Sequence, residues 1–380
     1  MSADAHLDDS SPAPYTVRLF EPDDRESYLE LYHTVFGGDG AEWFDWKYGS
    51  NPYVESVPTV VAVSEGRVVG AKSGMAFQVG RGDETMLAIQ PCDTMVHPEF
   101  RRRGLYSEMT EYMKSVFADG EPALFFNFPN EATLAGSLKH GWRVVGEVPA
   151  HYRIQDPTAF LTDGRRSARL EAAVRSTTAA ARSVTAAVRG ATRATRRFLT
   201  GGKSPRGISV ERHETIPVEA LAALYARTVP ETYHVVRDET FYRWRFGNPR
   251  WTYTTYTASR DGRIEAAAIV GQRLGDLPRD VVLLTDVLPL APGWAASDVY
   301  EPLLARIVTD YRDADAIVAP NAALPPAIRR QFGFRANDVF PLSRMTSPAV
   351  LVAYSLSEAV GDDCFEKANW TVEFSDMDTR

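Results

Sequence analysis

Residues 94–106 read Thr-Met-Val-His-Pro-Glu-Phe-Arg-Arg-Arg-Gly-Leu-Tyr. A strand is predicted to end near Val96, a short basic loop follows, and a helix is predicted to open near Gly104. That helix has apolar residues at Leu105, Met109 and Met113, a period near 3.6. A strand, a tight loop and a helix in this order predict an α/β fold in which a helix N-terminus lies at the end of a strand.

The loop has the properties of an anion-binding site. Free N–H groups at a helix N-terminus point outward, and the helix dipole favours negative charge. Gly104 lets the backbone approach a phosphate without a Cβ in the way. Arg101, Arg102 and Arg103 add charge-assisted contacts. The loop therefore predicts a site for a pyrophosphate, with or without a further phosphate.

The same stretch resembles the acetyl-CoA-binding motif of the GNAT superfamily of N-acetyltransferases, Val-x-Pro-x-x-Arg-x-x-Gly-x-Gly/Ala. Val96, Pro98, Arg101 and Gly104 match, whereas Tyr106 replaces the last small residue. The tandem-domain, Eis-like members are the most similar. The resemblance implies acetyl-CoA as acyl donor. It implies that the backbone of Met95 and Val96 pairs with the pantetheine arm, and that the pyrophosphate is held by Arg101, Arg102, Arg103, Gly104, Leu105 and Tyr106.

Residues 130–142 are similar to a second GNAT segment, Asn-x-x-Ala-x-x-x-Tyr-x-Lys-x-Gly-Phe. Asn130, Lys139 and Gly141 match it, and the resemblance implies that Asn130 contacts the pantetheine or the phosphate end. Ser137 stands where many members have a general-acid tyrosine. A serine hydroxyl has a high pKa, so Ser137 is a candidate acid only through water.

Asp93 is the candidate base. It lies three residues before Val96, which places it on the opposite face of the strand. Related enzymes have acids near this position that orient the amine or take its proton through water. A buried, hydrogen-bonded aspartate is the alternative, and its repetition as Asp286 favours that alternative.

The chain contains an internal repeat. The aromatic segment 43–52 recurs at 241–249, and each copy precedes a strand hairpin with a turn at Glu65-Gly66 or Asp261-Gly262. These landmarks predict two tandem GNAT-like domains with a mixed α/β (α+β) sheet. The second copy is degenerate, because residues 287–294 lack the arginines and place Pro289 at the strand end. We expect it to bind no CoA.

The domain organisation follows from these landmarks. We expect a disordered lead-in at 1–14, an acyl-CoA-binding domain at 15–156, a degenerate domain at 208–357 and a tail at 358–380. The tail contains a possible added strand at 370–374. The segment 157–207 holds eleven Lys or Arg and two acidic residues, and we interpret it as a basic linker. A polyanion or membrane-surface contact is the alternative.

Composition narrows the function classes. The chain has 380 residues, 44% hydrophobic and 24% charged, with a formal net charge of −8. An acidic body favours cationic acceptors over nucleic acid. Two cysteines and scattered histidines predict neither a disulfide framework nor a metal site. The lack of a long apolar run and of a signal peptide predicts a cytoplasmic protein with no transmembrane segment.

The sequence thus predicts an N-acetyltransferase that moves an acetyl group directly to a primary amine of a small molecule or peptide. A FemAB-like aminoacyl transferase is one alternative, against which the arginine-glycine loop speaks. A non-catalytic acyl-CoA sensor or scaffold is another. The acceptor and the oligomeric state, including a homo-oligomer, stay open.

Overall fold

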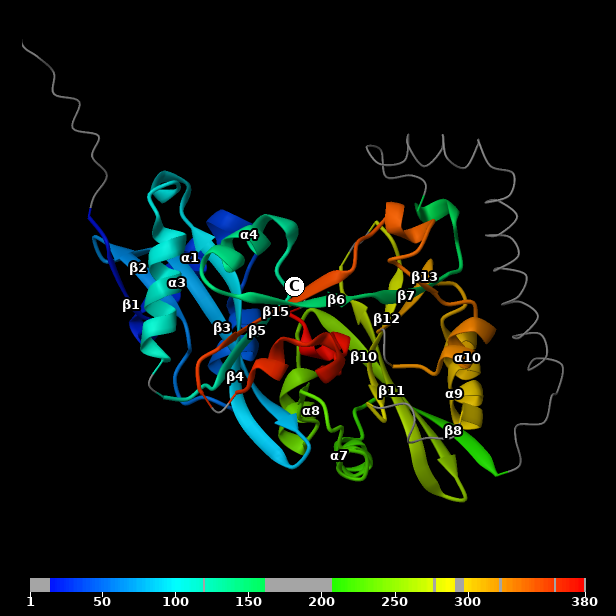
Figure 1. The fold of residues 1–380 in the computed structure, drawn as a ribbon. Coiled ribbons are helices and arrows are strands. Elements are labelled where there is room, and N and C mark those ends of the chain that lie inside the picture. The colour runs from blue at the N-terminus through cyan, green and yellow to red at the C-terminus, as the bar shows by residue number, and fades with distance from the viewer. Residues whose placement is uncertain are drawn as a thin grey trace, which may run out of the picture.

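Two mixed β-sheets lie side by side in the computed structural model (Figure 1). The structure describes residues 14–118, 120–160, 207–275, 278–290, 297–320, 323–358 and 360–378. The lead-in expected at 1–14 and the linker expected at 157–207 lie almost entirely outside these residues.

The first sheet has the order β1-β2-β3-β4-β5-β15-β6, with β9 pairing β3. Its strands are β1 Thr16–Leu19, β2 Val60–Ser64, β3 Arg67–Arg81, β4 Glu84–Val96, β5 Leu124–Asn127, β6 Arg143–Val148, β9 His234–Val235 and β15 Ala349–Ser355. Its helices are α1 Arg25–Phe36, α2 Ala41–Phe44, α3 Leu105–Val116 and α4 Glu131–Lys139. A π-helical turn, η2 Asp45–Gly49, follows α2.

The second sheet repeats this plan in the order β14-β7-β13-β12-β11-β10-β8. Its strands are β7 Ala150–Ile154, β8 Ile208–His213, β10 Trp251–Arg260, β11 Arg263–Arg273, β12 Val281–Leu288, β13 Ala316–Pro320 and β14 Arg335–Ala336. Its helices are α7 Val218–Ala226, α8 Glu239–Arg245, α9 Ser297–Asp310 and α10 Pro326–Gln331. The expected mixed α/β fold with two repeated units is therefore confirmed.

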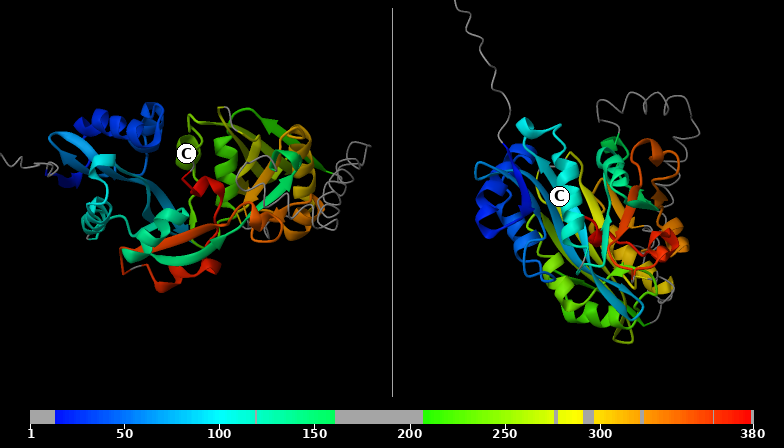
Figure 2. Two further views of the ribbon diagram at one scale, coloured as in Figure 1. Left: turned by 90° about the horizontal axis from the view of Figure 1, so that it is seen from above. Right: turned by 60° about the vertical axis from the view of Figure 1, so that its left-hand side comes forward.

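The two halves exchange a strand. β7 follows β6 after a single residue, yet it pairs with β13 and β14 of the second sheet. β15 comes from the second half and lies between β5 and β6 of the first sheet. Figure 2 shows β6 and β7 as one path that crosses from one sheet to the other. The sheets thus do not follow the sequence ranges 15–156 and 208–357.

One hydrophobic core joins the halves. It includes Tyr28 and Leu31 of α1 together with Leu221 of α7 and Phe241 of α8. The opposite faces have cores of their own, between the first sheet and α3 and between the second sheet and α9 and α10. The α1 face of the first sheet therefore meets the α7–α8 face of the second.

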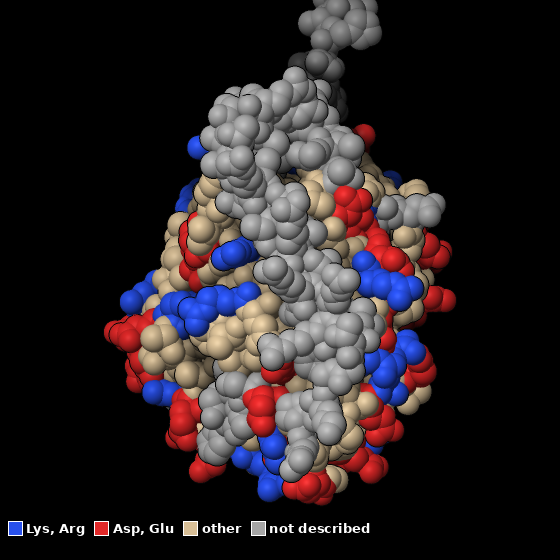
Figure 3. Space-filling model, turned by 90° about the vertical axis from the view of Figure 1, so that its right-hand side faces the viewer, with Lys and Arg blue, Asp and Glu red and all other residues tan. Residues whose placement is uncertain are grey.

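Charges are mixed on the end face of the second half. In Figure 3, Lys and Arg side chains lie among Asp and Glu side chains around the residues drawn in grey. The net charge of −8 thus coexists with basic side chains distributed over this face.

Candidate active site

The end of β4 has a free edge. β4 pairs in parallel with β5 at Ala88 and Ile89, and then continues to Val96 with no partner on that side within the described residues. A bulge accompanies the separation, because Ala71 pairs with Met95 and Ser73 pairs with Cys92. Free backbone groups at such an edge can pair with an extended ligand. Met95 and Val96, the residues expected to pair with the pantetheine arm, lie on this edge.

The loop after β4 ends at an uncapped helix. A 3-10 turn, η3 Pro98–Phe100, leads through the arginines to α3, which begins at Leu105. Gly104 has φ 86°, and a Cβ built there has no atom within 4 Å. Within the described residues no side chain caps this helix. The N–H groups of its first turn are therefore available to an anion.

The three arginines belong to the rim of this loop. Arg101 Nε donates to the Val96 carbonyl at 3.2 Å, and Arg103 donates to the Glu99 carbonyl at 2.5 Å. The Arg103 guanidinium also lies 4.7 Å from the centre of the Phe100 ring. Arg101 and Arg102 are exposed. These contacts hold the loop closed and keep positive charge at its surface.

Tyr106, the departure from the motif, lies against α4. A Cβ placed on Gly136 would be 3.0 Å from the Tyr106 ring, and the ring also contacts His140. Burial raises the pKa of Tyr106, and the nearby Ser137 side chain opposes that rise. Because the ring packs on Gly136 of α4, its bulk is accommodated by a residue that has no side chain.

Asn130 and Ser137 both lie on α4. Asn130 is exposed, and its Oδ1 caps the helix by accepting from the Thr133 N–H at 3.0 Å. Ser137 is buried and donates to the Thr133 carbonyl at 3.2 Å. Ser137 thus lies near Tyr106 in the structure. The side-chain oxygen of Asn130 is occupied in capping α4.

Asp93 lies in a different place, inside the core between the halves. Its carboxylate accepts from Lys47 Nζ at 2.6 Å and from the Tyr48 hydroxyl at 2.5 Å. The side chains of Asp93 and Lys47 are fully buried. Lys47 also pairs with Asp378 of the tail. Burial opposes the charge on Lys47, but Asp378 and Asp93 outweigh it and raise the pKa of Lys47.

The same cluster has ligand types that bind metals. Ligand atoms of Cys92, Asp93 and Asp378 lie within 4.8 Å of one another. The Lys47 ammonium hydrogen-bonds both carboxylates and so already supplies a cation to them.

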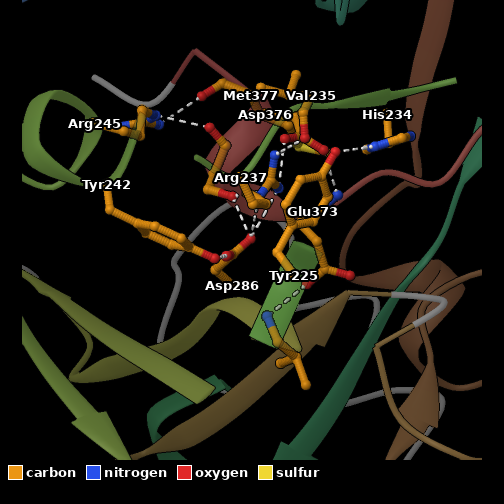
Figure 4. A network of polar contacts seen from close by, with 12 residues as sticks. Tyr225, His234, Val235, Arg237, Tyr242, Arg245, Asp286, Glu373, Asp376 and Met377 are labelled. Atoms are coloured by element: carbon orange, nitrogen blue, oxygen red, sulfur yellow. Dashed lines mark hydrogen bonds and ion pairs between the residues drawn. The ribbon is translucent and has the colours of Figure 1, made fainter. Parts of the chain in front are cut away.

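The repeat has a counterpart around Asp286, shown in Figure 4. Asp286 pairs with the buried Arg237 at 2.8 Å and accepts from the Ser375 hydroxyl at 2.7 Å and from the Tyr242 hydroxyl at 3.3 Å. Arg237 also pairs with Asp376 at 2.7 Å. In both halves, the repeated aspartate therefore anchors a buried cation.

In the second half, the C-terminal tail occupies the edge of β12 beyond its pairing with β13. β12 pairs with β13 at Val281, Val282 and Leu283 and then continues to Leu288. There Glu373 accepts from the Val287 N–H at 3.1 Å. Arg245, the repeat mate of Lys47, donates to the carbonyls of Ser375 and Met377. The added strand expected at 370–374 does not form: Trp370 makes an isolated bridge, and Phe374–Asp376 is a 3-10 turn.

Several buried polar residues were missed by the sequence reasoning, namely Lys47, Lys72, Arg237 and Glu373. A signal existed for two of them. Lys47 and Arg245 occupy the same position in the repeated aromatic segments, and Lys72 is a lone charge in the apolar run 68–77. The tail residues gave no such signal, since their partners are far away in sequence.

Comparisons with known proteins bear on the first half most directly. Residues 16–145 match the family described as acetyltransferase (GNAT) domain. No curated protein matches the sequence. Among the helices that the structure describes, none has both the length and the apolarity needed to cross a membrane.

Solved structures share the fold over nearly the whole chain. A GCN5-related N-acetyltransferase from Anabaena variabilis ATCC 29413 has 10% identity and a TM-score of 0.59, with 90% of this chain and 73% of that chain covered. Eis1 from Mycobacterium abscessus has 12% identity and a TM-score of 0.51, with 90% and 74% covered. A tandem GNAT protein from the clavulanic acid biosynthesis pathway has 14% identity and a TM-score of 0.52, with 90% and 99% covered.

Proposed function

We propose that this chain, whose residues 16–145 match the acetyltransferase (GNAT) domain family, is an acyltransferase that transfers an acetyl group from acetyl-CoA directly to a primary amine of a small molecule or peptide. The observation that carries the proposal is the free edge of β4 beside an uncapped, arginine-rimmed helix N-terminus. A strand edge suits the amide-rich pantetheine arm, and the helix N-terminus suits its pyrophosphate.

The first half is the donor site in this proposal. Arg101, Arg102, Arg103 and the N–H groups that open α3 would hold the pyrophosphate, while Met95 and Val96 would pair with the pantetheine. The side chain of Asn130 would offer its amide N–H, because its oxygen caps α4. The second half has Glu373 on the β12 backbone, which supports the expectation that it takes no CoA.

The transfer itself needs a neutral amine and a stabilised oxyanion. A backbone N–H near Met95 would donate to the thioester oxygen as its negative charge develops. The Asp93 carboxylate is committed to Lys47 at 2.6 Å and to the Tyr48 hydroxyl at 2.5 Å inside the core. We therefore propose that Asp93 positions the strand end through Lys47 and Tyr48, and that water takes the proton of the amine.

The acceptor class rests on charge. The acidic composition favours a cationic amine that loses one proton in the site. Both cysteines are buried free thiols, which supports a reducing, cytoplasmic location.

The test is a calorimetric titration of acetyl-CoA into the wild type and into Gly104→Glu. The substitution puts a side chain with negative charge on a φ of 86° in the anion loop. We expect micromolar binding by the wild type and at least a tenfold loss in the variant. Gly262→Glu is the matched control, because Gly262 has φ 80°, an equally open surrounding and a place in the second half.

A second measurement separates the alternatives. Thiol release from acetyl-CoA with a panel of primary amines would show turnover. Binding without thiol release would favour an acyl-CoA sensor or scaffold. Absence of binding to the wild type would overturn the proposal and favour an aminoacyl transferase of the FemAB kind.

A further inference from the structure

Lys72 is a buried lysine without an anionic partner. It lies on β3, is 5% exposed, and falls at the register shift where Ala71 pairs with Met95 and Ser73 pairs with Cys92. Among the described residues, no carboxylate and no hydrogen-bond acceptor pairs with its ammonium. Lys47, the other buried lysine of this half, has two carboxylates. Buried cations are normally paired, so an unpaired one at a strand bulge indicates a reactive or ligand-binding role.

The side chain lies on the face where the donor would bind. Its Nζ is 4.8 Å from the centre of the ring of Tyr106, the second residue of α3. On the same face, a Cβ built on Gly70 of β3 would lie 3.2 Å from Leu105 and 3.3 Å from Met109 of α3. Lys72 therefore occupies the space between the β4 bulge and the first turn of α3. A pantetheine arm that ran from the loop to Met95 would pass this space.

We propose that Lys72 is the general acid that protonates the sulfur of the departing CoA. The inference rests on the proposed function. The nitrogen of the acceptor amine forms a bond to the thioester carbon, and the carbon–sulfur bond breaks with its electron pair on sulfur. One N–H proton of Lys72 goes to that sulfur. The acceptor nitrogen releases one proton to water, and Lys72 regains one from water, so that the products are an amide and a free thiol.

The pKa of Lys72 supports its assignment as the general acid. Burial lowers the pKa of Lys72 to about 8, which is close to the value of about 8.5 for an ordinary thiol. Proton transfer between groups of similar pKa has little thermodynamic cost, and a catalytic acid works best near the operating pH. Burial raises the pKa of Tyr106, which makes that phenol a weaker donor.

Few titratable groups lie near Lys72 among the described residues. Cys92 of β4 acts on the pKa of Lys72 from the other face of the sheet, where its thiol contacts Tyr48, and burial raises the pKa of that thiol. Tyr106 of α3 is another, and His140 lies beyond the Tyr106 ring at the end of α4. An activity change near pH 8 would thus report on Lys72 and not on a neighbouring acid.

The experiment measures single-turnover thiol release from acetyl-CoA between pH 6 and 10 for the wild type, Lys72→Met, Lys72→Arg and Lys114→Met. An acid must carry its proton, so wild-type turnover is expected to fall as the pH rises through about 8. Lys72→Met is expected to lose about 10²–10⁴-fold in rate and to lose that alkaline limb. Its affinity for acetyl-CoA, measured by calorimetry, should stay within about twofold.

The variants distinguish the possible failures. Arginine keeps the positive charge but does not give up its proton in this range, so a Lys72→Arg rate equal to that of the wild type would overturn the general-acid role. A wild-type rate and an unchanged alkaline limb in Lys72→Met would overturn it too. Lys114 lies in the last turn of α3 and bonds Glu111, and its replacement should leave the rate unchanged. A wild type that neither binds acetyl-CoA nor releases thiol would instead refute the proposed function.

Discussion

Trp46 and Trp244 exchange hydrogen bonds with each other's backbone. The Trp46 indole N–H donates to the Trp244 carbonyl at 2.7 Å, and the Trp244 indole N–H donates to the Trp46 carbonyl at 2.9 Å. The rings are stacked, with centres 6.1 Å apart. The two residues hold equivalent positions in the repeated aromatic segments. A reciprocal contact of this kind is expected where two copies of one unit meet about a twofold axis.

Trp244→Phe should destabilise the junction of the halves. The substitution removes one of the two bonds, leaves the Trp46 carbonyl without its donor, and reduces contact with Tyr53 and Phe77. We expect a loss of about 1–3 kcal/mol in the free energy of unfolding, measured by urea denaturation. Trp251→Phe is the matched control, since the Trp251 indole N–H has no acceptor in the described part of the chain. Equal losses of unfolding free energy in Trp244→Phe and Trp251→Phe would argue against a contribution from the Trp244–Trp46 hydrogen bond.

Lys47→Met should be among the most damaging substitutions in the first half. It leaves the fully buried Asp93 without its cation, and such a loss costs about 3–5 kcal/mol. Adding Asp93→Asn should restore part of the stability, because the neutral amide can still accept from Tyr48. The measurement is a double-mutant cycle by urea denaturation. A strictly additive double variant would show that the pair is not coupled.

Glu373 should make stability depend on pH. Burial, together with Asp286 and Asp376, raises the pKa of Glu373 well above its usual range. A carboxyl whose pKa is higher in the folded chain binds its proton more tightly there. Its stabilisation is complete below the unfolded value of about 4.3 and is lost as the pH rises toward the folded value.

Glu373→Gln keeps the shape of the protonated acid and removes the titration. Its urea midpoint should therefore match that of the wild type near pH 4.5 and exceed it at pH 8, by about 1–3 kcal/mol in unfolding free energy. Glu366→Gln, on the exposed part of the tail, should follow the wild type at both pH values. A Glu373→Gln variant that was no more stable than the wild type at pH 8 would contradict the expectation.

Local sequence signals predicted local structure well. Glu65-Gly66 and Asp261-Gly262 form the two hairpin turns, and all four residues have positive φ, as tight turns between strands require. α3 begins directly after Gly104, where the glycine and the period of 3.6 placed it. These features depend on neighbours along the chain, so a single sequence contains the information for them.

Pairings between distant residues could not be predicted. Nothing in residues 349–355 indicates that β15 pairs with β5 and β6 of the other half. The buried cluster at Asp93 joins residues that are 46 and 331 positions apart. Alternation placed Asp93 on the face opposite Val96, yet only the fold shows that Lys47 is its partner.

The strand exchange makes the two halves interdependent. A fragment that ended after Ile154 would lack the strand between β5 and β6 and would carry β7 with no sheet to join. The remaining fragment would lack β7, the strand that pairs with β13, and its β15 would have no partner strand. Each piece alone would present open strand edges, which promote aggregation. Produced together, the two pieces should complement each other, so this chain is a natural candidate for a split protein whose parts regain structure only on meeting.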